Sequence, residues 1–199
     1  LFDSFSEYTE WNGIMGLGNI GEMNAIVKQK EKISSIIKVA EALQEKKIIK
    51  IADAVCGRGE VKLALIAGPS SSGKTTFSKR LSVQLAINGI HPIPLSMDNY
   101  FVPRTQTPRD ENGEYDFESI YAVDLELFNK QVNQLMNGEE VEIPYYNFET
   151  GEREYRGEKL KLGANGMLVI EGIHALNPML TEKIDKNKTW YEIPHGLTA

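Results

Sequence analysis

The sequence predicts an α/β fold in which helices flank an open, parallel β-sheet. Residues 63–67 form an apolar run, residues 68–75 form a glycine- and serine-rich loop, and the apolar residues of 76–85 recur at helical spacing. Residues 167–170 form a second short apolar run, of the kind found in parallel strands that are buried on both faces. Strand-like and helix-like segments alternate between the two runs. This order is expected of a sheet built from strand–helix–strand units.

Length and composition indicate one ordinary domain with a smaller addition. The chain has 199 residues, of which 41% are hydrophobic and 25% are charged, which suffices for one core and a polar surface. Its net charge of −6 argues against broad nucleic-acid binding, which leaves a basic footprint. The sequence has no apolar run of about 18 residues and no charged-then-apolar leader, so we expect a cytoplasmic protein without membrane contact. The single cysteine, Cys56, excludes an internal disulfide.

The first part of the chain predicts a helical N-terminal extension. Residues 1–22 are rich in glycine and aromatic residues and predict turns that lead into a helix. Residues 16–21 spell G-x-G-x-x-G, but no strand precedes them, so we reject a dinucleotide site. Residues 23–55 carry two apolar stripes with a slip of phase between them, which predicts two helices. We expect the extension to cover residues 1–58 and a P-loop domain to cover residues 59–199.

The loop at 68–75 reads G-x-x-x-x-G-K-[ST], the signature of a triphosphate-binding P-loop. Glycines at both ends let the backbone fold tightly, so that successive N–H groups face a phosphate. The following helix turns its positive end toward the same anion. Lys74 is expected to reach the β- and γ-phosphates, and Thr75 to offer its hydroxyl to Mg²⁺. The predicted triphosphate-binding residues are Gly68, Pro69, Ser70, Ser71, Ser72, Gly73, Lys74, Thr75 and Thr76.

The remaining segments complete the predicted sheet and its flanks. Residues 90–96 predict a second strand, whose prolines suit an edge position better than the middle of a sheet. Residues 98–123 are polar and predict a long loop, the kind of segment that often binds substrate. A helix is expected from Asp124, as its N-cap, to about residue 137, followed by a hairpin over 139–162 and a last strand over 189–193. The resulting order places the phosphate site at the carboxyl ends of parallel strands.

Two acidic residues directly follow predicted strands at that edge of the sheet. Glu171 follows the apolar run 167–170, where a carboxylate can orient Mg²⁺ near the phosphates. Asp98 follows the second strand, where it can take the proton from an attacking hydroxyl. Each has a structural alternative, a cap for the next turn in the case of Glu171 and an Asx-turn in the case of Asp98. For Asp98 the residues alone do not choose between the two roles.

Four stretches, in this order, resemble the uridine kinase branch of the uridine kinase/phosphoribulokinase family of P-loop kinases. They are the P-loop through Phe77, Met97-Asp98-Asn99-Tyr100-Phe101, Ile143-Pro144-Tyr145-Tyr146-Asn147-Phe148 and Val169-Ile170-Glu171-Gly172-Ile173-His174. The resemblance covers about residues 60–180. Residues 1–58 look like the front extension of long bacterial members, and we expect the kinase domain to be incomplete at its C-terminal end.

The resemblance implies ATP-dependent phosphorylation of a nucleoside 5′-hydroxyl, with ATP and Mg²⁺ as cofactors and pyrimidine salvage as the setting. Asp98 matches the family's catalytic aspartate and works there with Lys74. Thr75 and Glu171 match the metal-associated pair. Glu118 falls where the family has a ribose-binding aspartate, and Tyr146 matches a tyrosine near the base. No nucleic-acid partner is implied, and a homo-oligomer stays open.

Two positions depart from the family pattern around the base. Asn147 replaces a usual aspartate, and Gly151 falls where pyrimidine-specific members have a base-reading histidine. Loss of a directional polar group relaxes discrimination between bases, so we expect a uridine or cytidine kinase of loose preference that extends to purine nucleosides. Among the loop arginines, we select only Arg153 as a substrate contact. His174 is interpreted as a packed histidine under the sheet rather than as a base.

Three other functions are compatible with a P-loop. A kinase of another small acceptor, such as a sugar phosphate or pantothenate, would gather basic residues around that acceptor. A GTPase switch is disfavoured, because Asn129-Lys130 and Asn187-Lys188 lack the following aspartate of the guanine-reading motif. A non-catalytic nucleotide-binding module is disfavoured by the presence of both Asp98 and Glu171.

Overall fold

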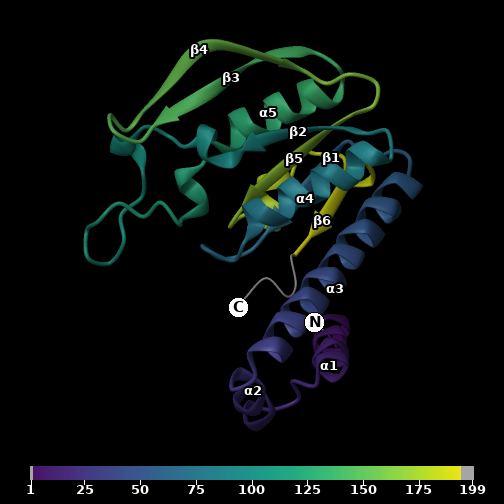
Figure 1. The fold of residues 1–199 in the computed structure, drawn as a ribbon. Coiled ribbons are helices and arrows are strands. Elements are labelled where there is room, and N and C mark those ends of the chain that lie inside the picture. The colour runs from purple at the N-terminus through teal and green to yellow at the C-terminus, as the bar shows by residue number, and fades with distance from the viewer. Residues whose placement is uncertain (1, 194–199) are drawn as a thin grey trace. The chain divides into compact units, whose positions relative to one another are not determined.

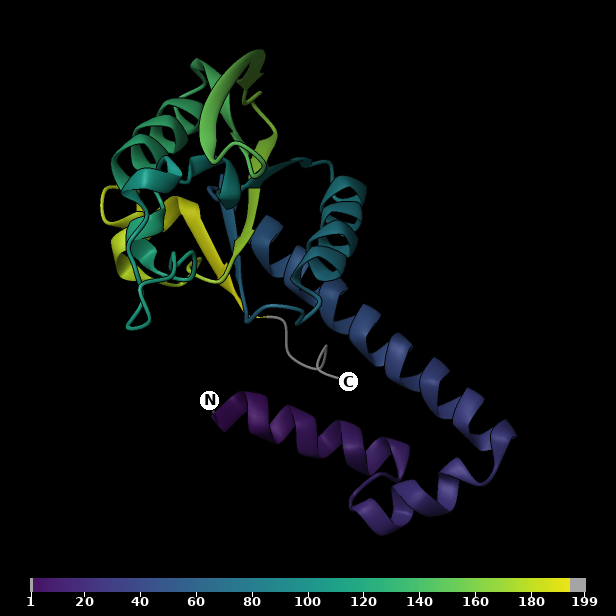
Figure 2. The ribbon, with the colours of Figure 1, turned by 90° about the vertical axis from the view of Figure 1, so that its left-hand side faces the viewer.

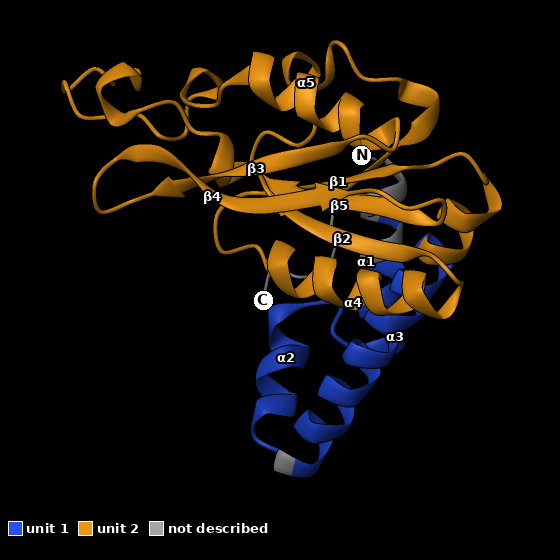
Figure 3. Cartoon of the chain, turned by 90° about the horizontal axis from the view of Figure 1, so that it is seen from above, with its two compact units in different colours: residues 1–51, 195–199 blue, residues 52–194 orange. Residues whose placement is uncertain are grey.

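The computed structural model describes residues 2–193. The chain divides into two compact units, residues 1–51 and residues 52–194 (Figure 3). The domain boundary between residues 58 and 59 that the sequence suggests stays a prediction. Within the described part of the chain, every helix is too short or too polar to cross a membrane.

The first unit contains helices α1 (Phe2–Met15) and α2 (Ile20–Val27) and most of α3 (Lys30–Gly57). Two predictions are wrong here. Residues 2–15 form a helix instead of turns, and α3 is one uninterrupted helix instead of two. Residues 44–47, Gln-Glu-Lys-Lys, are strong helix formers. The slip between the apolar stripes therefore does not break the backbone of α3.

The G-x-G-x-x-G stretch at 16–21 ends one helix and begins the next. The Asn19 side chain caps α2 by accepting from the Glu22 N–H at 3.0 Å, and Glu22 Oε2 accepts from the Gly18 N–H at 2.8 Å. This reciprocal arrangement satisfies two backbone donors at a helix start. Because α1, a helix, precedes the stretch, the rejection of a dinucleotide site stands.

The second unit is organised by a four-stranded parallel sheet in the order β2-β5-β1-β6 (Figure 1). Its strands are β1 (Leu63–Ala67), β2 (His91–Ser96), β5 (Gly166–Gly172) and β6 (Thr189–Glu192). This confirms the predicted open parallel sheet and the edge position of the proline-bearing strand β2. All five residues of β1 are buried, as expected for a central strand. In the register, Glu171 of β5 pairs with Ile66 of β1 and Ser96 of β2, so the three strands end at one level.

Two helices and a hairpin flank the sheet, which lies between α4 (Lys74–Ile87) and α5 (Leu125–Met136) (Figure 2). The hairpin consists of β3 (Glu140–Asn147) and β4 (Glu152–Lys161). Alternate residues of β1 serve the two sides, because Leu63, Leu65 and Ala67 belong to the core that contains α5. Asp124 caps α5 as predicted, accepting from the Leu127 N–H at 3.0 Å.

The long loop between β2 and α5 carries three short 3₁₀ helices, Met97–Tyr100, Arg104–Gln106 and Ile120–Ala122. Tyr100 fixes the start of the loop. Its ring meets Phe128 of α5 edge-on with 5.2 Å between the ring centroids, and its buried hydroxyl donates to Gln131 Oε1 at 3.0 Å. The 3₁₀ helix Met97–Tyr100, which directly follows β2, is thereby held against α5.

Candidate active site

The P-loop joins the end of β1 to the start of α4. Its two glycines are required for different structural reasons. Gly73 has a φ of +79°, a left-handed conformation that side chains disfavour. A Cβ on Gly68 would lie 2.7 Å from Ser72 Oγ, so a side chain there would displace the Ser72 hydroxyl. Because Gly73 sits at the N-cap of α4 without a capping side chain, the first amides of this helix are available to an anion.

Lys74 is the first residue of α4, and its side chain folds back over the loop. Its Nζ donates to the Pro69 carbonyl at 2.6 Å, which holds the ammonium group over the loop whose backbone amides are expected to bind phosphate. A phosphate seated on those amides would meet this positive charge directly.

Thr75 and Glu171 are joined across the carboxyl edge of the sheet. The Thr75 hydroxyl donates to Glu171 Oε1 at 2.7 Å, rather than Glu171 capping the turn that follows it. Glu171 Oε2 is buried, and no described group hydrogen-bonds to it. A buried carboxylate oxygen without a partner beside a threonine hydroxyl fits Mg²⁺, which prefers oxygen ligands. The described residues contain no group of three or more metal-ligating side chains, so water and phosphate would complete the shell, as Mg²⁺ commonly requires.

Asp98 lies in the 3₁₀ helix directly after β2 and lines the same cavity. Ser96 Oγ caps this helix by accepting from the Asp98 N–H at 3.3 Å. The side chain that stabilises the turn is therefore Ser96, which argues against the Asx-turn alternative for Asp98. Burial raises the pKa of the Asp98 carboxyl above its ordinary value, and the negative charge of Glu171 raises it further, while Lys74 opposes the rise. The three charged groups thus share one electrostatic environment.

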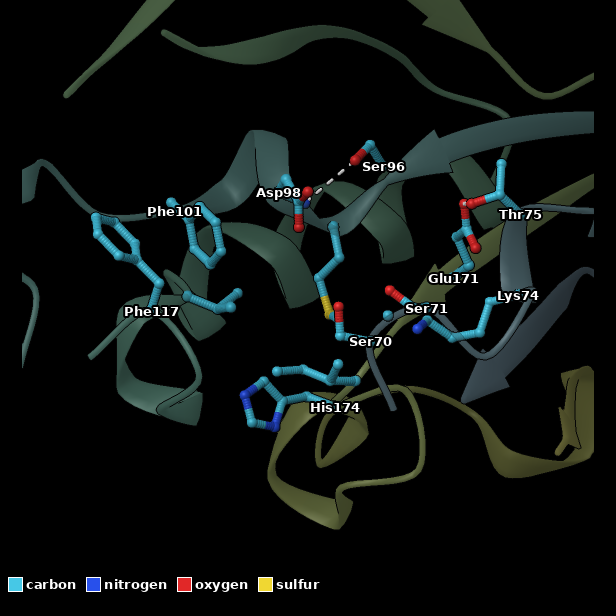
Figure 4. A pocket seen from close by; sticks show the side chains of 14 residues that line it. Ser70, Ser71, Lys74, Thr75, Ser96, Asp98, Phe101, Phe117, Glu171 and His174 are labelled. Carbon is cyan, nitrogen blue, oxygen red and sulfur yellow. Dashed lines mark hydrogen bonds between the residues drawn. The ribbon is translucent and has the colours of Figure 1, made fainter. Parts of the chain in front are cut away.

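These residues surround a cavity of about 330 Å³ that differs at its two ends (Figure 4). One end is polar and charged and is formed by Ser70, Ser71, Lys74, Thr75, Asp98 and Glu171. The other end is bounded by the rings of Phe101 and Phe117, with His174 below. Such a cavity accommodates a ligand that is anionic at one end and flat and apolar at the other.

An aromatic cluster continues behind Phe101. Its ring centroid is 5.8 Å from Phe117 and 5.4 Å from Tyr146, and Tyr146 in turn is 5.0 Å from Phe148. Tyr146 itself is only 1% exposed and packs against Phe101 without lining the cavity. Burial raises the pKa of its hydroxyl, and the neighbouring Arg104 guanidinium opposes the rise.

All three predicted substrate contacts, Glu118, Tyr146 and Arg153, lie outside the cavity lining. Glu118 is exposed, and its neighbour Phe117 lines the cavity instead. Arg153 of β4 binds Asp124, with 2.8 Å between Nη1 and Oδ2, and so braces the hairpin against the start of α5. The roles of Glu118, Tyr146 and Arg153 in substrate binding stay predictions.

His174 lies elsewhere than the sequence interpretation placed it. It sits in the turn after β5, lines the cavity, and has a buried Nε2 without a hydrogen-bond partner among the described residues. The signal that could have found it is its place, three residues past Glu171 at the same edge of the sheet. Phe101 and Phe117 were also missed as lining residues, because an aromatic residue in a loop is usually interpreted as core.

Gly151 is glycine because the side chain of Arg104 occupies the neighbouring space. It has a φ of +76°, and a Cβ there would lie 2.7 Å from Arg104 Cβ. We expect Gly151→Ala to lower the free energy of unfolding by about 2 kcal/mol or more, because it combines a left-handed backbone with overpacking.

Gly157→Ala is the matched control. Its φ of +77° is nearly the same, but its Cβ would meet nothing within 4 Å, so chemical denaturation should show only the backbone cost, about 1–2 kcal/mol. Equal losses in the two variants would contradict the packing argument.

Comparison with known proteins agrees with this architecture. Residues 63–185 match the family model for the phosphoribulokinase/uridine kinase family. The uridine kinase of Schizosaccharomyces pombe is 34% identical over 119 residues, which are 59% of this chain and 25% of that protein. The uridine kinase of Ureaplasma parvum serovar 3 is 26% identical over 133 residues, or 66% of this chain and 62% of that protein. The chain therefore spans between a quarter and about three fifths of these relatives.

A solved structure leads to the same result. The structure of a possible uridine kinase from Bacillus stearothermophilus superimposes with a TM-score of 0.57 at 26% identity, covering 73% of this chain and 79% of that one. The family model covers the whole stretch from β1 through the turn after β5, and so contains the P-loop, Asp98 and Glu171. The chain belongs to the phosphoribulokinase/uridine kinase family.

Proposed function

We propose that the protein carrying this chain transfers the γ-phosphoryl group of ATP to the 5′-hydroxyl of a nucleoside, of the uridine or cytidine type. The observation that carries the proposal is the two-ended cavity. Lys74, the Thr75–Glu171 pair and Asp98 lie at one end, and aromatic rings lie at the other. A nucleoside has matching ends, because its hydroxyl reacts and its base is flat. The names of the relatives support a nucleoside as the acceptor.

The reaction forms a bond between the acceptor oxygen and the γ-phosphorus and breaks the bond from that phosphorus to the bridging oxygen, releasing ADP. The P-loop amides and Lys74 hold the β- and γ-phosphate oxygens and neutralise their charge. Asp98 orients the acceptor hydroxyl and receives its proton. Thr75 and Glu171 would hold Mg²⁺, which when bound screens charge on the transferring phosphoryl group. Catalysis in this scheme is mostly positioning and electrostatics.

A kinase of another small acceptor, such as a sugar phosphate or pantothenate, is the second candidate. A phosphorylated acceptor calls for cations at its own end of the site. Of the described residues that line the cavity, Lys74 is the only lysine or arginine, and it lies at the P-loop end. The aromatic end therefore favours the nucleoside. The proposal places the enzyme in the cytoplasm and in pyrimidine salvage.

We expect the acceptor preference to be loose with respect to base size. Uridine, cytidine and inosine should all be phosphorylated, with values of kcat/KM within about one to two orders of magnitude, because a hydrophobic pocket discriminates size by that much. The measurement is ADP release by the full natural protein with each nucleoside, with pantothenate and fructose 6-phosphate as alternative acceptors. Turnover of uridine alone would contradict the loose preference, and turnover of pantothenate alone would contradict the proposed function.

A further inference from the structure

The turn that follows β5 holds His174 in a fixed place. The Ala175 N–H donates to the Gly172 carbonyl at 3.3 Å, and the Asn177 N–H donates to the His174 carbonyl at 2.8 Å. Ala175, the next residue in the chain, is fully buried in the core. The turn is therefore closed by its own backbone and anchored beneath, so the His174 side chain projects from a rigid base.

The same turn packs against the segment that carries Asp98. A Cβ on Gly172 would overlap Met97 Cε, so the buried Met97 side chain occupies the space that a larger residue would need. Met97 directly precedes Asp98 in the 3₁₀ helix after β2. Asp98 and His174 both line the cavity, and in the view of Figure 4 Asp98 lies above it and His174 below. A ligand that fills the cavity therefore lies between a carboxylate and an imidazole.

The Nε2 atom of His174 is buried, and no described group hydrogen-bonds to it. Such an atom loses its hydration without compensation, which costs free energy, and buried polar atoms in native proteins are nearly always paired with protein, water or ligand. Of the described residues that line the cavity outside its charged end, only Ser96 and His174 have polar side chains. Ser96 Oγ already accepts from the Asp98 N–H. His174 is thus the polar group left to face an acceptor.

The sugar of a bound nucleoside is the part that would meet this nitrogen. Its 5′-hydroxyl would lie at Asp98 and its base at the rings of Phe101 and Phe117, so the sugar would lie between them. Glu118, which the sequence suggested for the sugar hydroxyls, is exposed and does not line the cavity. A hydroxyl can donate and accept, so it pairs with Nε2 in either tautomer of a neutral imidazole, which a carbonyl or an amino group cannot do.

Resting on the proposed function, we propose that His174 positions the acceptor through a hydrogen bond between its Nε2 and a sugar hydroxyl of the nucleoside. The bond holds the sugar across the cavity from Asp98, so that the 5′-hydroxyl faces the carboxylate. His174 takes no proton in this scheme. Its loss should therefore act mainly through the KM for the nucleoside and leave the KM for ATP unchanged.

The test is a cycle that combines variants of the full natural protein with deoxynucleosides. The measurement is kcat/KM for uridine, 2′-deoxyuridine and 3′-deoxyuridine. In the wild-type protein, removal of the bonded hydroxyl should lower kcat/KM by about fivefold to tenfold, as for loss of one neutral hydrogen bond. In His174→Leu, kcat/KM for uridine should fall by a similar factor, whereas that for the deoxynucleoside should stay the same. The discrimination between the two should shrink accordingly.

Two further variants separate the two ring nitrogens of His174. The amide of glutamine reaches about as far as Nε2, whereas the amide of asparagine reaches only as far as Nδ1. We expect His174→Gln to keep part of the discrimination and His174→Asn to lose it. His91→Leu is the matched control, because His91 is exposed at the start of β2 and does not line the cavity. Its kinetics should equal those of the wild-type protein.

Each outcome decides the proposal. A loss in His174→Leu that is equal for uridine and both deoxynucleosides would overturn it in favour of a structural role. Unchanged kinetics would also overturn it and leave Nε2 to an ordered water, and a rise in the KM for ATP alone would assign His174 to the other substrate. In these three cases the wild-type protein still phosphorylates uridine, so only this inference fails. If the wild-type protein phosphorylates no nucleoside, the proposed function fails and the inference with it.

Discussion

Replacing Asp98 with asparagine should lower turnover by about a hundredfold to ten-thousandfold while leaving ATP binding nearly intact. Asparagine keeps the shape of the side chain but cannot receive the proton of the acceptor hydroxyl. The carboxylate is held at the cavity by the Ser96-capped 3₁₀ helix and shares its environment with Lys74 and Glu171. The measurements are single-turnover phosphate transfer to uridine and the Kd of a non-hydrolysable ATP analogue in the full natural protein.

Asp110→Asn provides a control within the same loop. The Asp110 carboxylate accepts from the backbone N–H groups of Asn112 and Glu114, both at 2.9 Å, and is fully exposed. This substitution should leave the transfer rate unchanged. A parallel loss of analogue binding in Asp98→Asn would contradict the assigned role and would make Asp98 a structural or metal-bound residue.

Lys74→Met should weaken binding of the ATP analogue by about 2 to 5 kcal/mol, the usual cost of truncating one partner of a buried charge pair. Lys74 is positioned over the P-loop by its contact with the Pro69 carbonyl, and methionine preserves its length without its charge. Titration of a fluorescent ATP analogue measures the effect. Turnover should fall with it, because the same charge stabilises the transferring phosphoryl group.

Lys79→Met is the matched control for this prediction. Lys79 lies on the same helix α4 but is exposed and does not line the Asp98 cavity. Its replacement should change analogue binding by no more than a screened surface charge does, less than about 1 kcal/mol. If both lysine variants lose affinity equally, the loss reflects net charge rather than the P-loop.

The parts of the fold that follow from local chemistry could be predicted from the sequence. The P-loop, the buried strand before Glu171 and the cap at Asp124 each depend on residues that are neighbours in the chain. The edge position of β2 follows from Pro92 and Pro94 in the same way, because proline cannot donate to a sheet ladder. The convergence of Asp98 with Glu171 also follows, since parallel strands end at one edge.

Features that depend on packing could not be predicted. The apolar stripes of α3 suggested a break, yet whether a helix continues is decided by the propensity of residues 44–47. The contact between Arg104 and Gly151 joins segments that are distant in sequence. The sequence alone therefore could not show that the Arg104 side chain occupies the space beside this glycine. His174 follows the same rule as Glu171, but a lone histidine gives no pattern by which to recognise it.

The two prolines of β2 have a consequence for self-association. The N–H of His91 faces β5, because it donates to the Asn165 carbonyl just before that strand. Pro92 and Pro94 occupy the alternate positions of β2, whose backbone groups face the open side. On its open side, β2 therefore presents carbonyl groups but no donor at either proline, and an incoming strand from another molecule could not form a continuous ladder there. Intermolecular growth of the sheet is blocked at this edge. Among the described strands, β6 is left as the edge at which a further strand can add.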